Sequence, residues 1–443
     1  MTSPLTRVSE KSGLTADKTD VGNYFVSNYP PFSFWKEEYL GDVEEAFGQA
    51  ARPGTPLGLY LHIPFCRKRC KFCYFRVYTD KNARDVERYL AALAGEMAIY
   101  SELPVVTGRS LDFVYFGGGT PSFLSARQLR SLVARLEESI TWNGAREVTF
   151  ECEPGTLNEK KLEAIREIGV TRLSLGIENF NDEILEENGR AHRSPEVFTS
   201  YEEARRLDFE QINVDLIAGM VGETPENWTD CIRKTIELEP GSVTIYQMEL
   251  PFNTIYSRQV TTGSSPVADW RTKRDWVAEA FDALQAEGYH VSSAYTLVKD
   301  PSTKFAYRDA LWRGADLIGA GVASFGHMSG VHYQNLDGFD GYCSTVEEGE
   351  LPLNRALKIT PRQAMIRQLI LQLKLGTVEA AYFRDAFGVD ILEEFRDVLR
   401  RHEQDGMLHV RDGRIELTRR GLLRVDGLLE PFFERPHRGA RYT

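Results

Sequence analysis

Short apolar runs alternate with amphipathic segments through the middle of the chain. The runs are rich in Val, Ile, Leu and aromatic residues, as buried parallel strands are. They predict strands over Leu57–His62, Asp112–Phe116, Glu147–Glu151, Arg172–Gly176, Gln211–Ile217, Val243–Glu249 and, more weakly, His290–Tyr295. The amphipathic segments predict helices over Arg84–Tyr100, Ser125–Ser139, Asn158–Ile168, Glu196–Leu207 and Glu226–Leu238. Repeated strand–helix units predict an α/β fold with a parallel sheet or barrel.

Polar or glycine positions recur where these strands end. They are His62, Gly117–Gly119, Glu151, Glu178, Asp215 and Glu249. In a β/α barrel the carboxyl ends of all strands open onto one face, where the chemistry is done. Since six separate strands deliver such positions, we predict a functional site at that face.

The two ends of the chain differ from its middle and predict three parts. Residues 1–50 form an N-terminal arm with a polar, mobile start and an aromatic stretch from Tyr24 to Trp35. This stretch either packs against the main domain or covers a site as a lid. Residues 51–300 form the barrel. Residues 301–443 form a third part, in which a Gly-rich stretch precedes helices and the hairpin Leu408–Leu417, as in a winged-helix unit.

Composition narrows the class of protein. The chain has 443 residues and a net charge of -12, which disfavours nucleic-acid binding. Its six cysteines do not form a secreted disulfide framework. The sequence after Met1 lacks the apolar core of a signal peptide, and no apolar run approaches the roughly 20 residues that span a membrane. These features predict a cytoplasmic protein without a transmembrane segment.

Three of the cysteines directly follow the first strand. Cys66, Cys70 and Cys73 have the spacing C-x3-C-x2-C. Thiolates suit iron–sulfur clusters, and three ligands leave one iron of a [4Fe–4S] cluster open. The alternative is a structural zinc ion, for which His62 is the only local candidate as fourth ligand. Cys152, Cys231 and Cys343 are isolated, and we interpret them as core residues.

The cysteine loop and six further motifs resemble the radical S-adenosylmethionine (SAM) superfamily, and more closely the oxygen-independent coproporphyrinogen III oxidase group. They are LHIPFCRKRCKFC (61–73), FGGGTPS (116–122), FECEPGTL (150–157), LSLGIENFNDEIL (173–185), NGRAH (188–192), NVDLIAGMVGETPENW (213–228) and LIGAGVASF (317–325). The resemblance runs from about Tyr29 to the C-terminus. It implies a partial (β/α)6-type barrel followed by a mostly helical, winged-helix-like domain.

The resemblance also implies roles for individual residues. Cys66, Cys70 and Cys73 would bind a [4Fe–4S] cluster whose open iron chelates SAM. The residues implied around SAM are Tyr60, Gly117, Gly118, Gly119, Thr120, Glu151, Glu178, Arg190 and Asp215. Such an enzyme takes one electron from a reducing partner such as flavodoxin or ferredoxin and forms a 5′-deoxyadenosyl radical. We place Glu249, beside Tyr246 and Gln247, among the residues that face the substrate.

Two departures from the oxidases bear on the reaction. Phe75 stands where the oxidases carry a fourth cysteine, and Glu178 replaces their usual glutamine. With the aromatic arm, Phe75 favours a related branch of C-methyltransferases, which are thought to bind two SAM molecules. Ala320 and Val322 lie in the stretch that matches the second SAM site. We therefore expect methylation of an apolar, unsaturated small molecule such as a quinone, a tetrapyrrole or a natural product.

Two alternatives stay open from the sequence. One is a true oxygen-independent coproporphyrinogen III oxidase, although no basic cluster for its four-carboxylate substrate is evident. The other is a heme chaperone, which would bind heme through His327 or His332 in the Gly-rich stretch.

Overall fold

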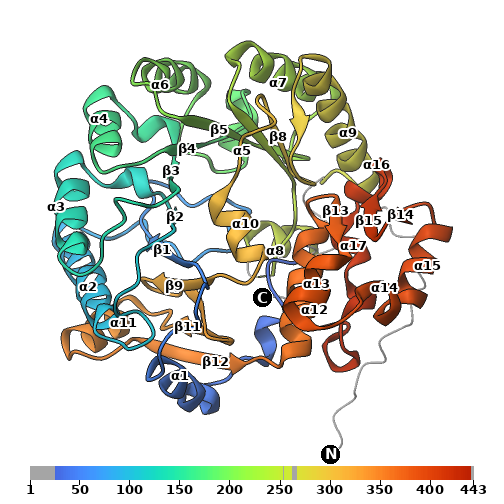
Figure 1. Ribbon diagram of the computed structural model, residues 1–443. Helices are drawn as coiled ribbons and strands as arrows, with labels where there is room; N and C mark the ends of the chain where they lie inside the picture. Colours follow the sequence, from blue (N-terminus) through green and yellow to red (C-terminus); the bar gives the residue numbers. More distant parts are fainter. Residues whose placement is uncertain (1–24, 253, 262–266, 441–443) are drawn as a thin grey trace, which may run out of the picture.

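A twelve-stranded sheet organises the molecule (Figure 1). The computed structural model describes residues 25–252, 254–261 and 267–440. The mobile start predicted for the arm, and Tyr24, lie outside these residues. The strand order is β12-β11-β10-β9-β1-β2-β3-β4-β5-β6-β8-β7, so the sheet curves but does not close into a complete barrel.

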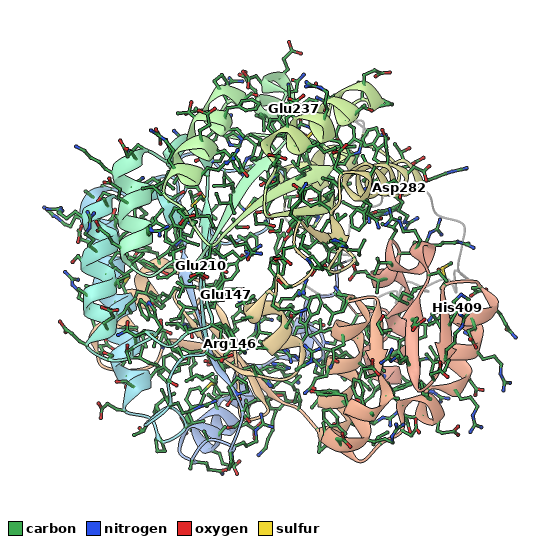
Figure 2. All side chains as sticks on the ribbon, turned by 45° about the horizontal axis from the view of Figure 1, so that its top comes forward. Arg146, Glu147, Glu210, Glu237, Asp282 and His409 are labelled. Carbon is green, nitrogen blue, oxygen red and sulfur yellow. The ribbon has the colours of Figure 1, made fainter. Side chains whose placement is uncertain are left out.

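Six consecutive parallel strands form the centre of the sheet and confirm the predicted α/β fold. They are β1 (Leu57–Ile63), β2 (Phe113–Gly118), β3 (Glu147–Cys152), β4 (Arg172–Glu178), β5 (Gln211–Ala218) and β6 (Ser242–Gln247). Residues of alternate positions point inward, as strand geometry requires. Figure 2 shows Glu147 near the middle of the ring of strands, while Glu237 and Asp282 lie at its periphery.

Helices cover the outer face of these strands. They are α2 (Ala83–Ser101), α3 (Ala126–Glu137), α4 (Glu159–Glu167), α6 (Ser194–Arg206), α7 (Pro225–Leu238) and α9 (Trp270–Ala286). Two shorter helices, α5 (Asp182–Glu187) and α8 (Ile255–Thr261), instead adjoin the loop after β1, where the Lys71 N–H donates to the Asn188 carbonyl oxygen and the Ile255 N–H donates to the Lys71 carbonyl oxygen. Asn82, Ser125 and Asn158 accept hydrogen bonds from the first backbone N–H groups of α2, α3 and α4, which fixes where these helices begin. Their apolar stripes and the strands share one large core.

The sheet extends beyond the six strands on both sides, and the sequence predicted only the weak seventh strand on one of them. On one side, β9 (Asp316–Ala320) pairs parallel to β1, followed by antiparallel β10 (Phe325–Met328), β11 (Val331–Asn335) and β12 (Leu353–Lys358). The Gly-rich stretch is therefore part of the sheet, and the division predicted at residue 300 does not coincide with the sheet's edge. Helix α11 (Phe339–Glu347) packs against α2.

On the other side, the prediction of one seventh strand is wrong. The segment forms two short antiparallel strands, β7 (His290–Val291) and β8 (Thr296–Val298), because residues 292–295 turn back. Helix α10 (Ala306–Trp312) then packs within the ring of strands (Figure 1). Backbone N–H groups of Ala306 and Tyr307 donate to Glu147 at the start of β3, so α10 covers the amino end of the barrel.

The C-terminal unit has a hydrophobic core of its own. It comprises α12 (Pro361–Leu373), β13 (Thr377–Glu379), α13 (Ala380–Phe387), α14 (Ile391–Glu394), α15 (Arg396–Gln404), β14 (Leu408–Arg411), β15 (Arg414–Leu417), α16 (Arg419–Leu422) and α17 (Val425–Leu428). The predicted hairpin is confirmed as β14–β15, with Asp412 and Gly413 at positive φ in its turn. Residues 419–428 form two separate short helices, α16 and α17.

The described part of the arm packs between the sheet and the C-terminal unit. It includes α1 (Leu40–Phe47). Tyr29 is fully buried, and its hydroxyl lies 2.7 Å from Nδ1 of His437. The Trp35 ring stacks on His332 with 5.0 Å between ring centroids. These contacts support the packing interpretation of the aromatic stretch. Separately, no helix among the described residues is both long and apolar enough to cross a membrane.

Candidate active site

The three cysteines lie in the loop after β1, at the carboxyl end of the barrel. All three are partly exposed. The N–H group of Cys66 donates to the carbonyl oxygen of Tyr78, and that of Cys73 to Cys70. Thr120 and Arg190 lie 3.4 Å and 3.5 Å from the sulfur atoms of Cys66 and Cys70. The loop thus presents three thiols toward the ends of neighbouring strands.

The contacts of the loop fit a cluster better than a zinc ion. His62, the proposed fourth zinc ligand, has Nδ1 3.2 Å from the Tyr60 hydroxyl and Nε2 3.2 Å from the Arg76 carbonyl oxygen. Both ring nitrogens therefore have protein partners. Among the described residues, no three His, Cys, Asp or Glu side chains group as a single metal ion requires. Three thiols suit a [4Fe–4S] cubane, whose ligands attach to separate irons.

The thiols also need a metal to become thiolates. Burial raises the pKa of Cys66 to about 11 and the pKa of Cys73 to about 12. Protonated thiols do not ligate metals, so metal binding would displace their protons. Cys152, Cys231 and Cys343 are buried away from the loop, which confirms their interpretation as core residues.

The glycine run at the end of β2 lies beside Glu151. Gly118 has φ of +109° and donates its N–H to Glu151 Oε2 at 3.2 Å. A Cβ atom at Gly118 would come within 2.5 Å of the His62 ring, and one at Gly119 within 2.8 Å of the Ile63 carbonyl oxygen. A Cβ atom at Gly117 would likewise crowd the rings of Tyr60 and Tyr115. The backbone of β2 can therefore approach β1 and a ligand only because these residues are glycines.

Three carboxylates predicted to face the site are brought together inside the barrel. Tyr115 donates to Glu151 Oε1 at 2.7 Å, and Ser174 donates to Asp215 Oδ2 at 2.7 Å. Burial raises the pKa of Glu151 to about 7, and the charge of Asp215 adds to this rise. Burial likewise raises the pKa of Asp215.

Glu178 and Arg190 complete this group. Burial raises the pKa of Glu178 to about 7, with Arg190 acting against the rise and Asp215 and Glu151 adding to it. Glu178 has φ of +64°, a conformation that non-glycine residues seldom adopt outside functional sites. Arg190 lies 3.7 Å from Glu178 and donates to the Gly176 carbonyl oxygen at 2.6 Å. The site therefore gathers three carboxyl groups close to the Arg190 guanidinium.

Aromatic side chains provide the accessible surface around these carboxylates. Tyr74, Phe75 and Tyr246 expose 47%, 43% and 42% of their surface, unusually large fractions for such residues. The rings of Tyr74 and Phe75 stack with 4.6 Å between centroids. Burial, and then the charges of Glu249, Cys73 and Glu151, raise the pKa of Tyr74, so it faces the same interior. This wall is apolar with hydroxyl groups at its edges.

The remaining predicted residues are placed differently. Tyr60 lies inside the barrel, where its ring stacks on Tyr115. Glu249 follows β6, and its charge acts on Tyr74 and Lys273. Ala320 and Val322 have no exposed surface, and the Val322 N–H donates to the Tyr89 hydroxyl at 3.1 Å. Their predicted contact with a second SAM stays a prediction.

The histidines of the heme hypothesis are also enclosed. His327 and His332 expose 6% and 1% of their surface, and their Nδ1 atoms lie 3.0 Å apart. His332 Nε2 lies 3.1 Å from the Tyr29 carbonyl oxygen. As placed, neither histidine presents an exposed ligand to a heme.

Sequence reasoning missed Tyr74 and Tyr115 as parts of the site. Tyr115 donates to Glu151, and Tyr74 contributes to the accessible wall. The alternation of inward positions along the predicted strand from 112 to 116 was a signal for Tyr115. For Tyr74, the only signal in the sequence was its position next to Cys73.

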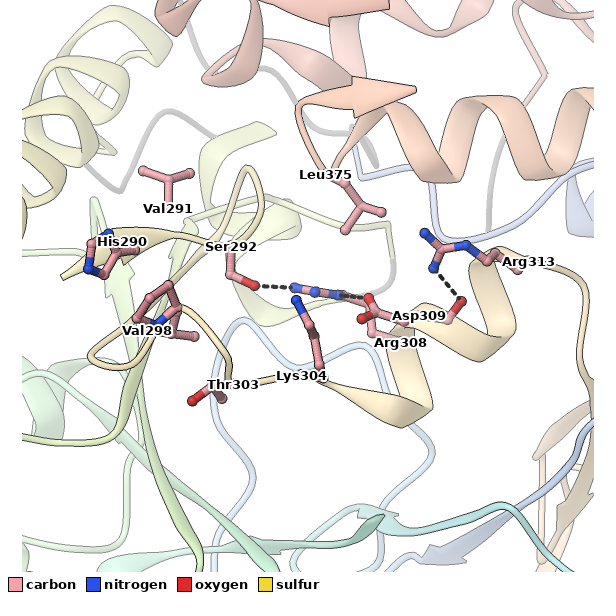
Figure 3. Close-up of a pocket in the computed structure, with 11 residues that line it drawn as sticks. His290, Val291, Ser292, Val298, Thr303, Lys304, Arg308, Asp309, Arg313 and Leu375 are labelled. Carbon is pink, nitrogen blue, oxygen red and sulfur yellow. Dashed lines mark hydrogen bonds and ion pairs between the residues drawn. The ribbon is translucent and has the colours of Figure 1, made fainter. Parts of the chain in front are cut away.

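A pocket of about 270 Å³ lies elsewhere, between the β7–β8 hairpin, α10 and Leu375 (Figure 3). Its lining includes Lys304, Arg308 and Arg313, but none of the predicted site residues. In Figure 3, Arg308 lies between Ser292 and Asp309, with which it forms hydrogen bonds. This pocket is not where the cysteines and carboxylates meet.

Comparison with known proteins agrees with this geometry. Residues 60–234 match the model of the radical SAM superfamily, and residues 359–424 match that of the HemN C-terminal domain. The oxygen-independent coproporphyrinogen III oxidase of Escherichia coli (strain K12) is 28% identical over 417 residues, which cover 90% of each chain. The heme chaperone HemW of Bacillus subtilis (strain 168) is 27% identical over 367 residues, covering 82% of this chain and 96% of the relative.

A solved structure shares the whole fold. The structure of coproporphyrinogen III oxidase (HemN) from Escherichia coli superposes with a TM-score of 0.81 at 24% identity, covering 92% of this chain and 96% of that one. The likeness includes the sheet and the C-terminal unit.

Proposed function

The chain belongs to the radical SAM superfamily, in the group that includes oxygen-independent coproporphyrinogen III oxidases, and from this premise we propose that it abstracts a hydrogen atom from an apolar, unsaturated small molecule. Cys66, Cys70 and Cys73 would hold a [4Fe–4S] cluster. With SAM and one electron from a reducing partner such as flavodoxin or ferredoxin, this cluster would supply the radical chemistry of the superfamily, hydrogen-atom abstraction by a 5′-deoxyadenosyl radical. We also propose a cytoplasmic location, since binding a cluster requires reduced thiols.

The residues around the cysteines would orient SAM. Gly117, Gly118 and Gly119 let backbone groups approach its amino group, and Thr120 lies beside the first cysteine. Glu151 and Asp215 accept hydrogen bonds, the latter from the ribose, and Arg190 pairs with the carboxylate. Glu178 can accept but cannot donate a hydrogen bond when ionised. Tyr60, on β1, would support the SAM site by stacking on Tyr115. Glu249 would face the substrate.

The observation that carries the substrate class is the aromatic wall of Tyr74, Phe75 and Tyr246. Three cations near the wall, Lys273, Lys374 and Arg190, are already engaged. Lys273 Nζ donates to the Met248 carbonyl oxygen at 2.7 Å, and Lys374 Nζ pairs with Asp426 at 2.6 Å. Arg190 is tied to Gly176 and Glu178. A substrate with four carboxylates would meet Glu151, Glu178 and Asp215 instead of a basic surface, so an apolar substrate suits the site better.

The finer proposal is C-methylation with two SAM molecules. It rests on Phe75 in place of the fourth cysteine and on the aromatic surface. One SAM would supply the radical and the other the methyl group, with Ala320 and Val322 near the second. The named activity of the Escherichia coli relative, coproporphyrinogen oxidation, is the main competing function.

Product analysis of the reconstituted enzyme tests both the radical SAM chemistry and the C-methylation. Anaerobically reconstituted, dithionite-reduced protein is incubated with SAM and, in separate reactions, a menaquinone, a tetrapyrrole and coproporphyrinogen III. We expect 5′-deoxyadenosine in every reaction and S-adenosylhomocysteine together with a methylated product only with a methyl acceptor. Cys343→Ala, a change at a buried cysteine outside the loop, is the matched control for Cys70→Ala.

Two outcomes would contradict the proposal at different levels. Loss of coproporphyrinogen carboxyl groups as CO2, without S-adenosylhomocysteine, would replace methylation with the oxidase reaction. Protein that contains zinc, or that never cleaves SAM under strong reduction, would exclude radical SAM chemistry altogether.

A further inference from the structure

Arg172 is a buried cation inside the barrel. It is the first residue of β4 and exposes 5% of its surface. It shares its inward face with Ser174 and Gly176, because side chains alternate along a strand. Its guanidinium lies 4.3 Å from the centroid of the Phe305 ring. Stacking of this kind leaves the N–H edge of a guanidinium free to meet a planar acceptor.

No described residue pairs with this guanidinium. Arg172 Nε is fully buried and has no hydrogen-bond acceptor, and no described carboxylate forms an ion pair with it. Glu147, one strand away, is engaged by other donors: Ala306 N–H at 2.8 Å and Thr149 Oγ1 at 3.0 Å. Burying a charge without a partner is strongly unfavourable, so structures rarely contain one unless a ligand completes the pair.

A second unmet donor lies beside it. Gln211 pairs with Arg172 in the register of β4 and β5, so the two side chains leave the sheet on the same face. Gln211 Nε2 is also buried without an acceptor. Two adjacent donors without acceptors form one half of a carboxylate-binding arrangement, in which a guanidinium and an amide share the two oxygens.

Arg172 and the candidate active site share the same interior. The charge of Arg172 acts to lower the pKa of Glu151, Asp215 and Tyr246, although burial raises the pKa of each overall. Tyr246 is part of the aromatic wall. A ligand whose apolar body lies on that wall can therefore direct an anionic group toward the amino end of the barrel, where α10 closes the interior.

We propose that Arg172 and Gln211 bind the carboxylate of a ligand that occupies the barrel. The inference rests on the proposed function and narrows its substrate to an amphipathic acid, with an apolar, unsaturated body and one carboxylate. The same chemistry has a second source, the carboxylate of a second SAM molecule. The simpler alternative is that Arg172 only balances the charges of Glu151 and Asp215 through space.

A pair of isosteric probes separates these possibilities. Binding of 2-naphthoate and of neutral 2-naphthamide is measured by calorimetry on the reconstituted full-length protein. We expect the wild type to bind the naphthoate at least tenfold more tightly than the amide. Arg172→Gln should abolish this preference, and Gln211→Ala should reduce it about threefold. Arg146→Gln, at an exposed arginine that precedes β3 and pairs with Asp112, should leave the preference unchanged.

A second measurement identifies the source of the carboxylate. Equilibrium dialysis with labelled SAM counts the molecules bound to the wild type and to Arg172→Gln, after circular dichroism has shown that the variant is folded. If the variant binds one SAM fewer, the carboxylate site is occupied by a second SAM. If the SAM count is equal and only the naphthoate preference is lost, the site belongs to the substrate.

The inference is overturned if the wild type shows no preference for naphthoate, or if Gln211→Ala and a folded Arg172→Gln both keep it. Reductive cleavage of SAM, followed in the same preparations, separates this failure from that of the proposed function. Wild-type protein that cleaves SAM but does not distinguish acid from amide would refute only the carboxylate site.

Discussion

Two regions of the molecule bury carboxylates, and they treat them in opposite ways. At the edge where α2 meets the strands β9 to β11, Glu96 is fully buried and accepts from Tyr342 Oη at 2.6 Å, Asn335 Nδ2 at 2.6 Å and Gly321 N–H at 2.8 Å. At the mouth of the barrel, the described residues offer Glu178 only one partner, Arg190 at 3.7 Å, and the backbone of Glu178 is left-handed. The first carboxylate joins three chain segments. The second is left available for a ligand.

The comparison shows that burial alone does not reveal the role of a carboxylate. Burial raises the pKa of Glu96 to about 7, and it raises the pKa of Glu178 to about 7 as well. The two carboxylates differ in how many hydrogen-bond donors surround them. A complete set of donors indicates a structural role, whereas an incomplete set beside like charges indicates a binding site.

The largest expected effect is at the mouth and concerns chemistry rather than stability. Cys70→Ala removes one of three cluster ligands, so we expect iron and sulfide content to fall at least severalfold and 5′-deoxyadenosine formation to fall at least a hundredfold. Iron analysis and product chromatography measure both. Cys343→Ala should keep both values near wild type; if it loses the cluster equally, the assignment of the ligands is wrong.

At the edge, the effect should be on stability. Glu96→Ala leaves the buried Tyr342 hydroxyl and the Gly321 N–H without an acceptor, whereas Asn335 Nδ2 keeps the Gly321 carbonyl oxygen. We expect the free energy of unfolding to fall by about 3 kcal/mol. Urea denaturation measures the change. Glu102→Ala, at an exposed glutamate just after the same helix, should change it by no more than about 0.5 kcal/mol. Equal losses in the two variants would show that the hydrogen-bond network does not stabilise this edge.

The pH dependence of stability sharpens the same contrast. The folded-state pKa of Glu96 is raised to about 7 from an ordinary value of 4.5, so the folded protein binds this proton more tightly than the unfolded chain. The resulting stabilisation is complete below pH 4.5 and is lost as the pH rises through 7. It amounts to about 3 kcal/mol.

Replacing the Glu96 carboxyl group with an amide isolates its contribution to the pH dependence of stability. Urea denaturation of Glu96→Gln at several pH values should show a shallower decline between pH 4.5 and 7 than the wild type. Parallel curves for the two proteins would mean that Glu96 does not take up a proton in this range.

The smallest expected effect is a gain in stability, opposite in sign to the loss expected for Glu96→Ala. Glu178→Gln removes one of three clustered carboxylates without leaving a donor group unsatisfied, so the metal-free protein should gain up to about 1 kcal/mol of stability. Thermal unfolding at pH 8, where the carboxylates are ionised, gives the measurement. A loss larger than that of Glu96→Gln would contradict the proposed difference between the two regions.

The sequence predicted the parts of the fold that depend on local periodicity. The six parallel strands and the helices between them follow from apolar runs and amphipathic spacing, and the turn at Asp412 and Gly413 follows from turn chemistry. The sequence failed for β9 to β11, since glycines such as Gly319 and Gly326 weaken a strand pattern. These glycines are required because Phe325 and Tyr333 pack against them, which is a tertiary fact.

By itself, then, the sequence determined the order of the elements and the cysteine loop, because hydrophobic period and ligand spacing are properties of neighbouring residues. Only the tertiary structure decided that Arg172 and Gln211 stand side by side without acceptors, that both nitrogens of His62 are engaged, and that Glu96 is satisfied while Glu178 is not. The physical reason is that donors and acceptors far apart in the chain meet only when the sheet forms, and whether a buried charge finds a partner depends on those meetings.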